Sequence, residues 1–118
     1  AVEAGLEGII ISNHGGRQLD GAPASFDLLP EISEAVTGRL EIICDGGIRR
    51  GSDIVKAVAS GATAAMTARP YLYALAAGGE KGVDQVLEFL YLGVERTMAL
   101  TGAASVDDLT KELISRTK

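Results

Sequence analysis

Three short apolar runs, each followed by a glycine-rich polar loop and then by a helical pattern, constrain this chain most. Gly8–Ile11 and Glu41–Cys44 have the length and apolar character of buried strands. Ala62–Thr67 is rich in alanine, so its place in the alternation, rather than its composition, predicts a third strand. The connections are long enough to make neighbouring strands parallel. The sequence therefore predicts an α/β fold with a parallel sheet, either open or part of a (β/α)8 barrel.

Helical periodicity follows each predicted strand. The first helix is expected over Ser25–Val36, and Pro30 fits best near its first turn, so this helix should begin late or kink. After the second strand, Ser52 is the expected N-cap and Gly61 the expected stop. A short helix over Tyr71–Ala77 should follow the third strand.

A long helix is expected from about Val83 to Leu100, after a break marked by Gly78, Gly79 and Gly82. A short terminal helix should run from Ser105 to about Ser115, because an N-cap residue and two aspartates open it. The buried stripe of the long helix is expected to comprise Val83, Val86, Leu87, Leu90, Val94 and Met98.

The loop after the first strand holds the only histidine of the chain, His14, and Arg17 lies three residues later. A base that exchanges a proton near neutral pH beside a permanent cation suits a substrate with a carboxylate and a removable proton. A lone histidine in a loop is more often an ordinary surface or structural residue. The residues in the loops after the other two strands are therefore needed to choose between these interpretations.

Those two loops carry residues typical of anion binding. Asp45–Arg49 follows the second strand, and Ala68 with Arg69 follows the third. Backbone N–H groups of a glycine-rich turn can hold a phosphate, and arginines add charge and forked hydrogen bonds. Each feature alone is equally typical of an ordinary loop, but both together favour a phosphate site. In (β/α)8 barrels this site follows strands 7 and 8, so the first strand here would be strand 6.

Composition restricts the class of protein. Apolar residues make up 47% of the chain and charged residues 23%, which is typical of a globular domain. No apolar run approaches the roughly 18 residues of a membrane-spanning helix, and a net charge of −5 argues against general nucleic-acid binding. Cys44 is expected to be a small buried apolar residue, and no metal site is expected. A single cysteine fits a reducing compartment, so a cytoplasmic location is expected, with peripheral association with a membrane as the alternative.

The loop motifs together resemble one family. Ser-Asn-His-Gly-Gly-Arg-Gln-Leu-Asp at 12–20, Asp-Gly-Gly-Ile-Arg-Arg-Gly-Ser-Asp at 45–53 and Arg-Pro-Tyr-Leu-Tyr at 69–73 are similar to the C-terminal part of the FMN-dependent α-hydroxy-acid dehydrogenase/oxidase family. That family includes glycolate oxidase, lactate oxidase, L-lactate dehydrogenase and flavocytochrome b2. The similarity covers nearly the whole chain, including Glu95–Leu100. The first motif is specific to this family, whereas the other two occur more widely among FMN barrels.

The resemblance implies a role for each matching residue. His14 would be the active-site base, and Arg17 would bind the substrate carboxylate. The residues implied to contact FMN are Ser12, Asp45, Gly46, Gly47, Ile48, Arg49, Ala68 and Arg69. This chain departs from the family at Ala68, where glycine is usual, and at Thr67, where an aliphatic residue is usual. The aspartate that partners the family's histidine would lie upstream of these residues.

The resemblance therefore implies FMN-dependent oxidation of a lactate-like or glycolate-like 2-hydroxy acid to the 2-oxo acid. Residues 1–118 would be the C-terminal segment of a single FMN-binding TIM-barrel domain, with about strands 6–8 and their helices. The complete protein would be a homo-oligomer. The segment alone is expected to be inactive, with Ile9–Ile11, Ile42 and Ile43 partly facing water. Two alternatives remain: an FMN barrel acting on another substrate, such as a peptide, or a catalytically incomplete phosphate-binding fragment.

Overall fold

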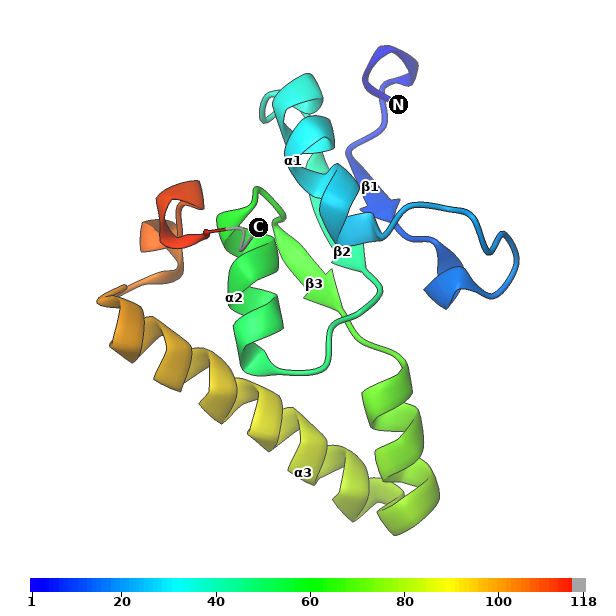
Figure 1. Cartoon of the computed structure of the whole chain (residues 1–118), viewed down its shortest axis with the longest axis vertical. Coiled ribbons are helices and arrows are strands. Elements are labelled where there is room, and N and C mark those ends of the chain that lie inside the picture. The colour runs from blue at the N-terminus through cyan, green and yellow to red at the C-terminus, as the bar shows by residue number, and fades with distance from the viewer. Residues whose placement is uncertain (116–118) are drawn as a thin grey trace.

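The computed structural model describes residues 1–115 and contains a three-stranded parallel sheet in the order β1-β2-β3 (Figure 1). Ile10 pairs with Ile43, and Cys44 pairs with Ala65, so the strands are in register along their whole length. This confirms the α/β class and the predicted alternation. The strands are β1 (Gly8–Ile11), β2 (Glu41–Asp45) and β3 (Ala64–Met66), and the helices are α1 (Ser25–Val36), α2 (Gly51–Ala59) and α3 (Arg69–Thr101).

One face of the sheet is covered and the other is open. Side chains alternate between the two faces along each strand, and the covered face packs against α1 and α2 around Leu29, Cys44 and Ala57, all of which are fully buried. On the other face, Ile10 is 57% exposed and Met66 is 43% exposed. A parallel sheet is normally covered on both faces. The face that carries Ile10 and Met66 lacks such a cover in this part of the chain.

The isoleucines follow this alternation instead of being exposed together. Ile11 and Ile42 are buried beneath the helices, whereas Ile9 and Ile43 are only partly buried and Ile10 faces outward. The expectation that all five would partly face water is therefore wrong for Ile11 and Ile42. Their side chains point to the helical layer, which this segment itself supplies.

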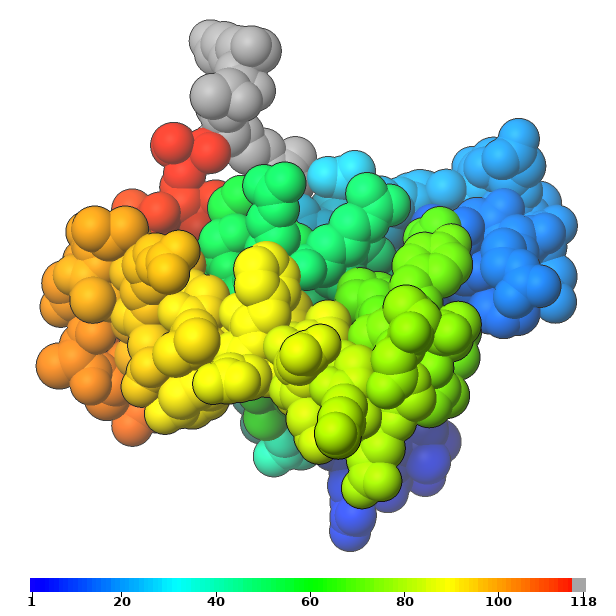
Figure 2. Space-filling model, turned by 90° about the horizontal axis from the view of Figure 1, so that it is seen from below, coloured from blue at the N-terminus to red at the C-terminus, as the bar shows by residue number. Residues whose placement is uncertain are grey.

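The long third helix bends sharply at Gly79, where φ is +59° and ψ is −144° (Figure 1). The predicted break is thus confirmed at Gly79, whereas Gly82 is an ordinary buried residue of the helix. The short and the long predicted helices are the two arms on either side of the bend. The second arm crosses the start of α2 where Gly51 and Gly93 meet, and a Cβ on Gly51 would overlap the Gly93 backbone. Figure 2 shows the second arm, yellow to orange, extending from the centre to the left of this view, with the first arm beside it in yellow-green.

Three details of the helices differ from expectation. Arg50, not Ser52, is the N-cap of α2, because the Asp53 carboxylate reaches back to the N–H groups of Arg49 and Arg50 and brings the helix start forward. Leu87 is 52% exposed and lies outside the buried stripe of α3. Helix α1 begins at Ser25 and includes Pro30, so the expected late start is wrong.

The predicted terminal helix is also wrong within the described residues. Two single 3-10 turns, Val106–Asp108 and Lys111–Leu113, take its place. The Asp108 carboxylate accepts hydrogen bonds from the N–H groups of Ala104 and Ser105, which lowers the pKa of that carboxyl group. Leu109 then adopts an extended conformation and is buried against α2, and this packing interrupts any continuous helix.

Within the described residues, no helix is long and apolar enough to cross a membrane.

The third strand is shorter than expected, since Ala62 and Thr63 precede it and Thr67 follows it.

We predict that the isolated 118-residue chain self-associates through the open sheet face. Ile10→Thr should weaken this association by about tenfold, since full burial of such a side chain contributes about 1.5–3 kcal/mol. Leu100→Thr is the matched control, because Leu100 is equally apolar and more exposed but lies at the end of α3. Sedimentation equilibrium measures both effects. A monomeric wild-type chain, or equal effects of the two substitutions, would contradict the prediction.

Candidate active site

The carboxyl ends of the three strands surround one cavity of about 430 Å³. Its lining contains nine of the ten residues for which the sequence predicts a role, and these come from the loops after β1, β2 and β3. Parallel pairing places these three loops at the same edge of the sheet. The nine are His14, Arg17, Asp45, Gly46, Gly47, Ile48, Arg49, Ala68 and Arg69.

The tenth residue, Ser12, does not line the cavity but forms hydrogen bonds to two residues that do. Its hydroxyl donates a 2.6 Å hydrogen bond to Asp45 Oδ2 and accepts one of 3.1 Å from the His14 N–H. Ser12 and Asp45 stand just past β1 and at the end of β2, respectively. The Ser12 side chain therefore connects two neighbouring strand ends and holds the backbone of the histidine loop.

The histidine loop has an unusual backbone. His14, Gly15 and Gly16 have φ values of +54°, +68° and +71°, so three successive residues are left-handed. Left-handed conformation is uncommon for residues other than glycine, and such strain concentrates at functional sites. The Asn13 carboxamide holds this turn, since its Oδ1 accepts the Gly15 N–H and its Nδ2 donates to the Pro23 carbonyl.

The imidazole of His14 is held by Gln18. Its Nδ1 contacts the Gln18 side-chain amide at Oε1, and this contact orients the ring. Nε2 is therefore the ring nitrogen that remains available to a ligand. Sequence reasoning missed Gln18 as a partner of His14, although the two are four residues apart in the same motif.

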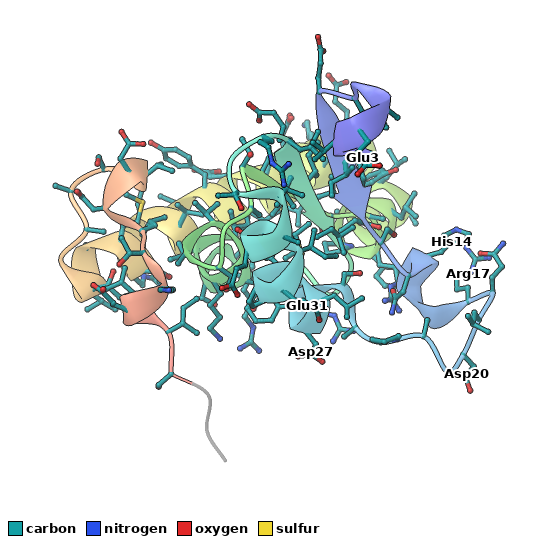
Figure 3. All side chains as sticks on the ribbon, turned by 90° about the horizontal axis from the view of Figure 1, so that it is seen from above. Glu3, His14, Arg17, Asp20, Asp27 and Glu31 are labelled. Carbon is teal, nitrogen blue, oxygen red and sulfur yellow. The ribbon has the colours of Figure 1, made fainter. Side chains whose placement is uncertain are left out.

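The charged side chains on and near the loop after β1 differ in whether they line the cavity. Figure 3 shows His14 and Arg17 together on the loop that follows β1, whereas Asp20 lies farther along this loop, at its tip. His14 and Arg17 both line the cavity. The acidic residues Asp27 and Glu31 belong to α1 and do not line the cavity (Figure 3).

The loop after β2 turns at two left-handed glycines, Gly46 with φ +103° and Gly47 with φ +81°. The N–H groups of Arg49 and Arg50 donate to Asp53 Oδ2 at 3.0 and 2.9 Å. These two N–H groups are therefore already paired with a carboxylate. An anion in the cavity would be held by guanidinium groups and by earlier N–H groups of the loop.

Positive charge dominates the lining. Arg17, Arg49 and Arg69 all line the cavity, and within residues 1–115 none of them pairs with a carboxylate. Arg69 lies against the histidine loop, since a Cβ on Gly15 would be 3.4 Å from its Nη2. Asp45 is the single acidic residue in the lining described, and Ser12 already bonds to it. This donor set fits a phosphate group and a carboxylate together, which is the pair of anions that FMN and a 2-hydroxy acid would bring.

The two departures from the family pattern have different consequences. Ala68 has φ −121°, which any residue adopts, so this position does not need glycine. Thr67, which was not predicted to be a site residue, donates from Oγ1 to the Ile48 carbonyl at 2.8 Å. The lining also includes Met66, which belongs to no motif, and Leu72, which belongs to the 69–73 motif but was given no role.

Cys44 lies directly beneath the site in β2. It is free and fully buried, and burial, followed by the neighbouring Asp45 charge, raises the pKa of its thiol. Its surroundings are the apolar core, so it acts as a small core side chain. Within residues 1–115, no group of three or more His, Cys, Asp or Glu side chains is arranged to hold a metal ion.

The pattern of the family described as FMN-dependent dehydrogenase matches residues 1–116. The chain belongs to this family. It is 52% identical over 111 residues to a peroxisomal (S)-2-hydroxyacid oxidase of Arabidopsis thaliana, covering 94% of this chain and 31% of that protein. It is 53% identical over 109 residues to an L-lactate oxidase of a Nostoc strain, covering 92% of this chain and 30% of that protein.

A third relative has a different kind of name. A pre-mycofactocin synthase of Mycobacterium tuberculosis is 54% identical over 110 residues, covering 93% of this chain and 28% of the relative. The chain thus spans about a third of the length of these curated relatives.

Solved structures confirm the fold class. A mandelate oxidase with 3,3-difluoro-2-hydroxy-3-phenylpropionic acid matches with a TM-score of 0.91 and 50% identity, covering 94% of this chain and 34% of that one. A mandelate oxidase with benzoyl-formic acid matches with a TM-score of 0.88 and 52% identity, covering 91% and 32%. The three strand–helix units are therefore part of a TIM barrel of a family of FMN-dependent oxidoreductases.

We predict that Gly15→Ala in the complete protein weakens FMN binding slightly, because its new Cβ comes into van der Waals contact with the Arg69 guanidinium, 3.4 Å from Nη2, and restricts the positions open to that group. It should also lower the free energy of unfolding by about 1–2 kcal/mol through left-handed strain. Gly5→Ala is the matched control, since Gly5 has the same φ of +68° but no neighbour within 4 Å of a new Cβ. Flavin fluorescence titration and urea unfolding measure the two effects. Equal FMN affinities in the two variants would contradict the proximity argument.

Proposed function

We propose that the complete protein oxidises a 2-hydroxy acid to the 2-oxo acid with FMN, and that residues 1–118 form the C-terminal segment of its single TIM-barrel domain. One observation carries this proposal: His14, with an oriented imidazole, and Arg17 line the same cavity as two further unpaired arginines. A base, a carboxylate-binding cation and a second anion site are what the reaction requires. The 2-hydroxyacid oxidase and lactate oxidase relatives support the substrate class.

Arg17 and His14 divide the work on the substrate. The Arg17 guanidinium would hold the carboxylate with two parallel hydrogen bonds and so orient the α-carbon. Nε2 of His14 would accept a proton, either from the α-hydroxyl or from the α-carbon. Gln18 would hold the ring in its orientation during this step. FMN, when bound, supplies the two-electron acceptor.

The remaining residues would hold the cofactor. Arg49 and Arg69 would bind the phosphate from neighbouring loops, with N–H groups from the loop after β2 and from Ala68. Asp45 and Ser12, which bond to each other here, offer a carboxylate and a hydroxyl that suit the hydroxyl groups of a ribityl chain. The glycines at 46 and 47 let the backbone approach closely.

We also propose a cytoplasmic, homo-oligomeric protein that acts on a small molecule and binds no nucleic acid. The net charge of −5 and the single cysteine support the location and the absence of nucleic acid. The exposed apolar side chains of α3 support association with a further protein surface.

A second candidate is an FMN barrel of this family that acts on another substrate, such as a peptide. The pre-mycofactocin synthase, which is as similar to this chain as the oxidases are, favours this alternative. Steady-state assays of the FMN-loaded complete protein with lactate, glycolate and mandelate discriminate the two. Turnover of one of these acids supports the first candidate, and inactivity with all three supports the second.

Replacing the histidine should separate catalysis from cofactor binding. In the complete protein, His14→Ala is expected to lower kcat by about 10²–10⁴-fold, the usual contribution of a general base. FMN should remain bound, because the phosphate-binding arginines are unchanged; the flavin absorbance of the purified variant checks this. A kcat near that of the wild type would remove His14 from the mechanism.

The arginines should divide between substrate and cofactor. Arg17→Lys keeps the charge but loses the forked geometry, so KM should rise by about tenfold while FMN affinity stays constant. Arg69→Ala should do the reverse and weaken FMN binding. Separate titrations with FMN and with the substrate measure both constants. If Arg17→Lys loses FMN while Arg69→Ala raises only KM, the two roles are exchanged.

A further inference from the structure

We propose that the Thr67 hydroxyl is a positioning group that sets the relative placement of Arg49 and Arg69, and so determines how tightly the phosphate of FMN is bound. This inference rests on the proposed function for the identity of the anion. It concerns a residue that carries no charge and belongs to neither arginine-bearing motif.

The argument begins where the strand ladder ends. The last pair between β2 and β3 joins Asp45 to Met66, and beyond it each strand enters its own loop. Thr67 continues the connection with a side chain, because its Oγ1 donates to the Ile48 carbonyl at 2.8 Å in a partly buried position. A valine or isoleucine at this position would have the same branching at Cβ but no hydrogen to donate.

The bond fixes a whole peptide unit. All peptide bonds described are trans, so the Ile48 carbonyl and the Arg49 N–H point in opposite directions. Thr67 holds the carbonyl, and Asp53 Oδ2 holds the N–H at 3.0 Å. Ile48 itself is buried in the core, which anchors the loop from below. The point at which the Arg49 side chain leaves the backbone is thereby set.

The same bond also sets the distance to the second arginine. Arg69 follows Thr67 by two residues and begins α3. Both arginines line the cavity, and within residues 1–115 neither is held by a carboxylate. Because no ion pair orients these side chains, their geometry depends on where the two backbones are placed. The Thr67 hydroxyl is a direct connection between those backbones.

The chain supplies a matched control at the other end of the strand. Thr63 lies just before β3, and its Oγ1 accepts a 3.2 Å hydrogen bond from the Ile42 N–H. Thr63→Val and Thr67→Val thus each remove one threonine hydrogen bond to the loop or strand of β2. Only Thr67 lines the cavity. A general loss of stability should appear in both variants, whereas a loss of phosphate placement should appear in one.

The experiment compares FMN with riboflavin, which has no phosphate, in fluorescence titrations of the complete apoprotein. Thr67→Val should weaken FMN binding by about three- to tenfold, the usual effect of one hydrogen bond. Thr67→Val should leave riboflavin binding constant. Thr67→Ser, which keeps the hydroxyl, should bind FMN with the affinity of the wild type. Thr63→Val should leave both affinities unchanged, and inorganic phosphate should compete with FMN less well in Thr67→Val than in the wild type.

Three results would overturn the inference while the proposed function stands: unchanged FMN affinity in Thr67→Val, an equal loss in Thr63→Val, or an equal loss for riboflavin. A wild-type protein that binds neither flavin would overturn both the inference and the proposed function. Retained FMN binding without turnover of any 2-hydroxy acid would overturn only the proposed substrate, since the phosphate comparison is independent of turnover.

Discussion

Parallel pairing of β1, β2 and β3 is the constraint on which the rest of this structure depends. Because all three strands run in the same direction and in register, Ser12, Asp45 and Thr67 lie at one edge of the sheet. Side-chain hydrogen bonds then join the loops in sequence: Ser12 to Asp45 across the first gap, and Thr67 to the Ile48 carbonyl across the second. The cavity is therefore held by polar connections above the ladder, and its arginines remain unpaired for ligands.

The one-sided burial of the sheet has a different origin. Helices α1 and α2 return to the same face of the sheet, so Leu29, Cys44 and Ala57 are completely buried between these helices and the strands, whereas α3 packs on α2. The opposite face keeps Ile10 and Met66 largely exposed. Since the relatives are about three times as long as this chain, the geometry agrees with a part of a barrel whose inner face meets further strands. A barrel buries both faces of each strand, and this explains why β-branched residues occur on both faces of the strands here.

Sequence reasoning identified the strands, the loops and the charged residues, because these depend on local patterns. Apolar runs ending in glycine and polar residues locate strand ends without any tertiary contact. It was wrong where a distant contact decides the outcome. The terminal segment from Ser105 has helix-opening residues, but Leu109 packs against α2 and breaks the helix. Leu87 has helical spacing, yet α2 and its neighbours cover only one side of α3, so this side chain is exposed.

The sequence by itself determined the family, the cofactor class and which residues carry charge and titrate, since motifs such as 12–20 and 45–53 contain this chemistry in their side chains. Only the tertiary structure decided which of these groups remain available. It paired His14 with Gln18, and it used the N–H groups of Arg49 and Arg50 for Asp53. It also showed that Ala68 has a negative φ, which does not require glycine, and that Thr67 joins two loops. The physical reason is that hydrogen bonds and φ values depend on the three-dimensional approach of segments up to 33 positions apart, as for Ser12 and Asp45, and a local sequence pattern does not contain that approach.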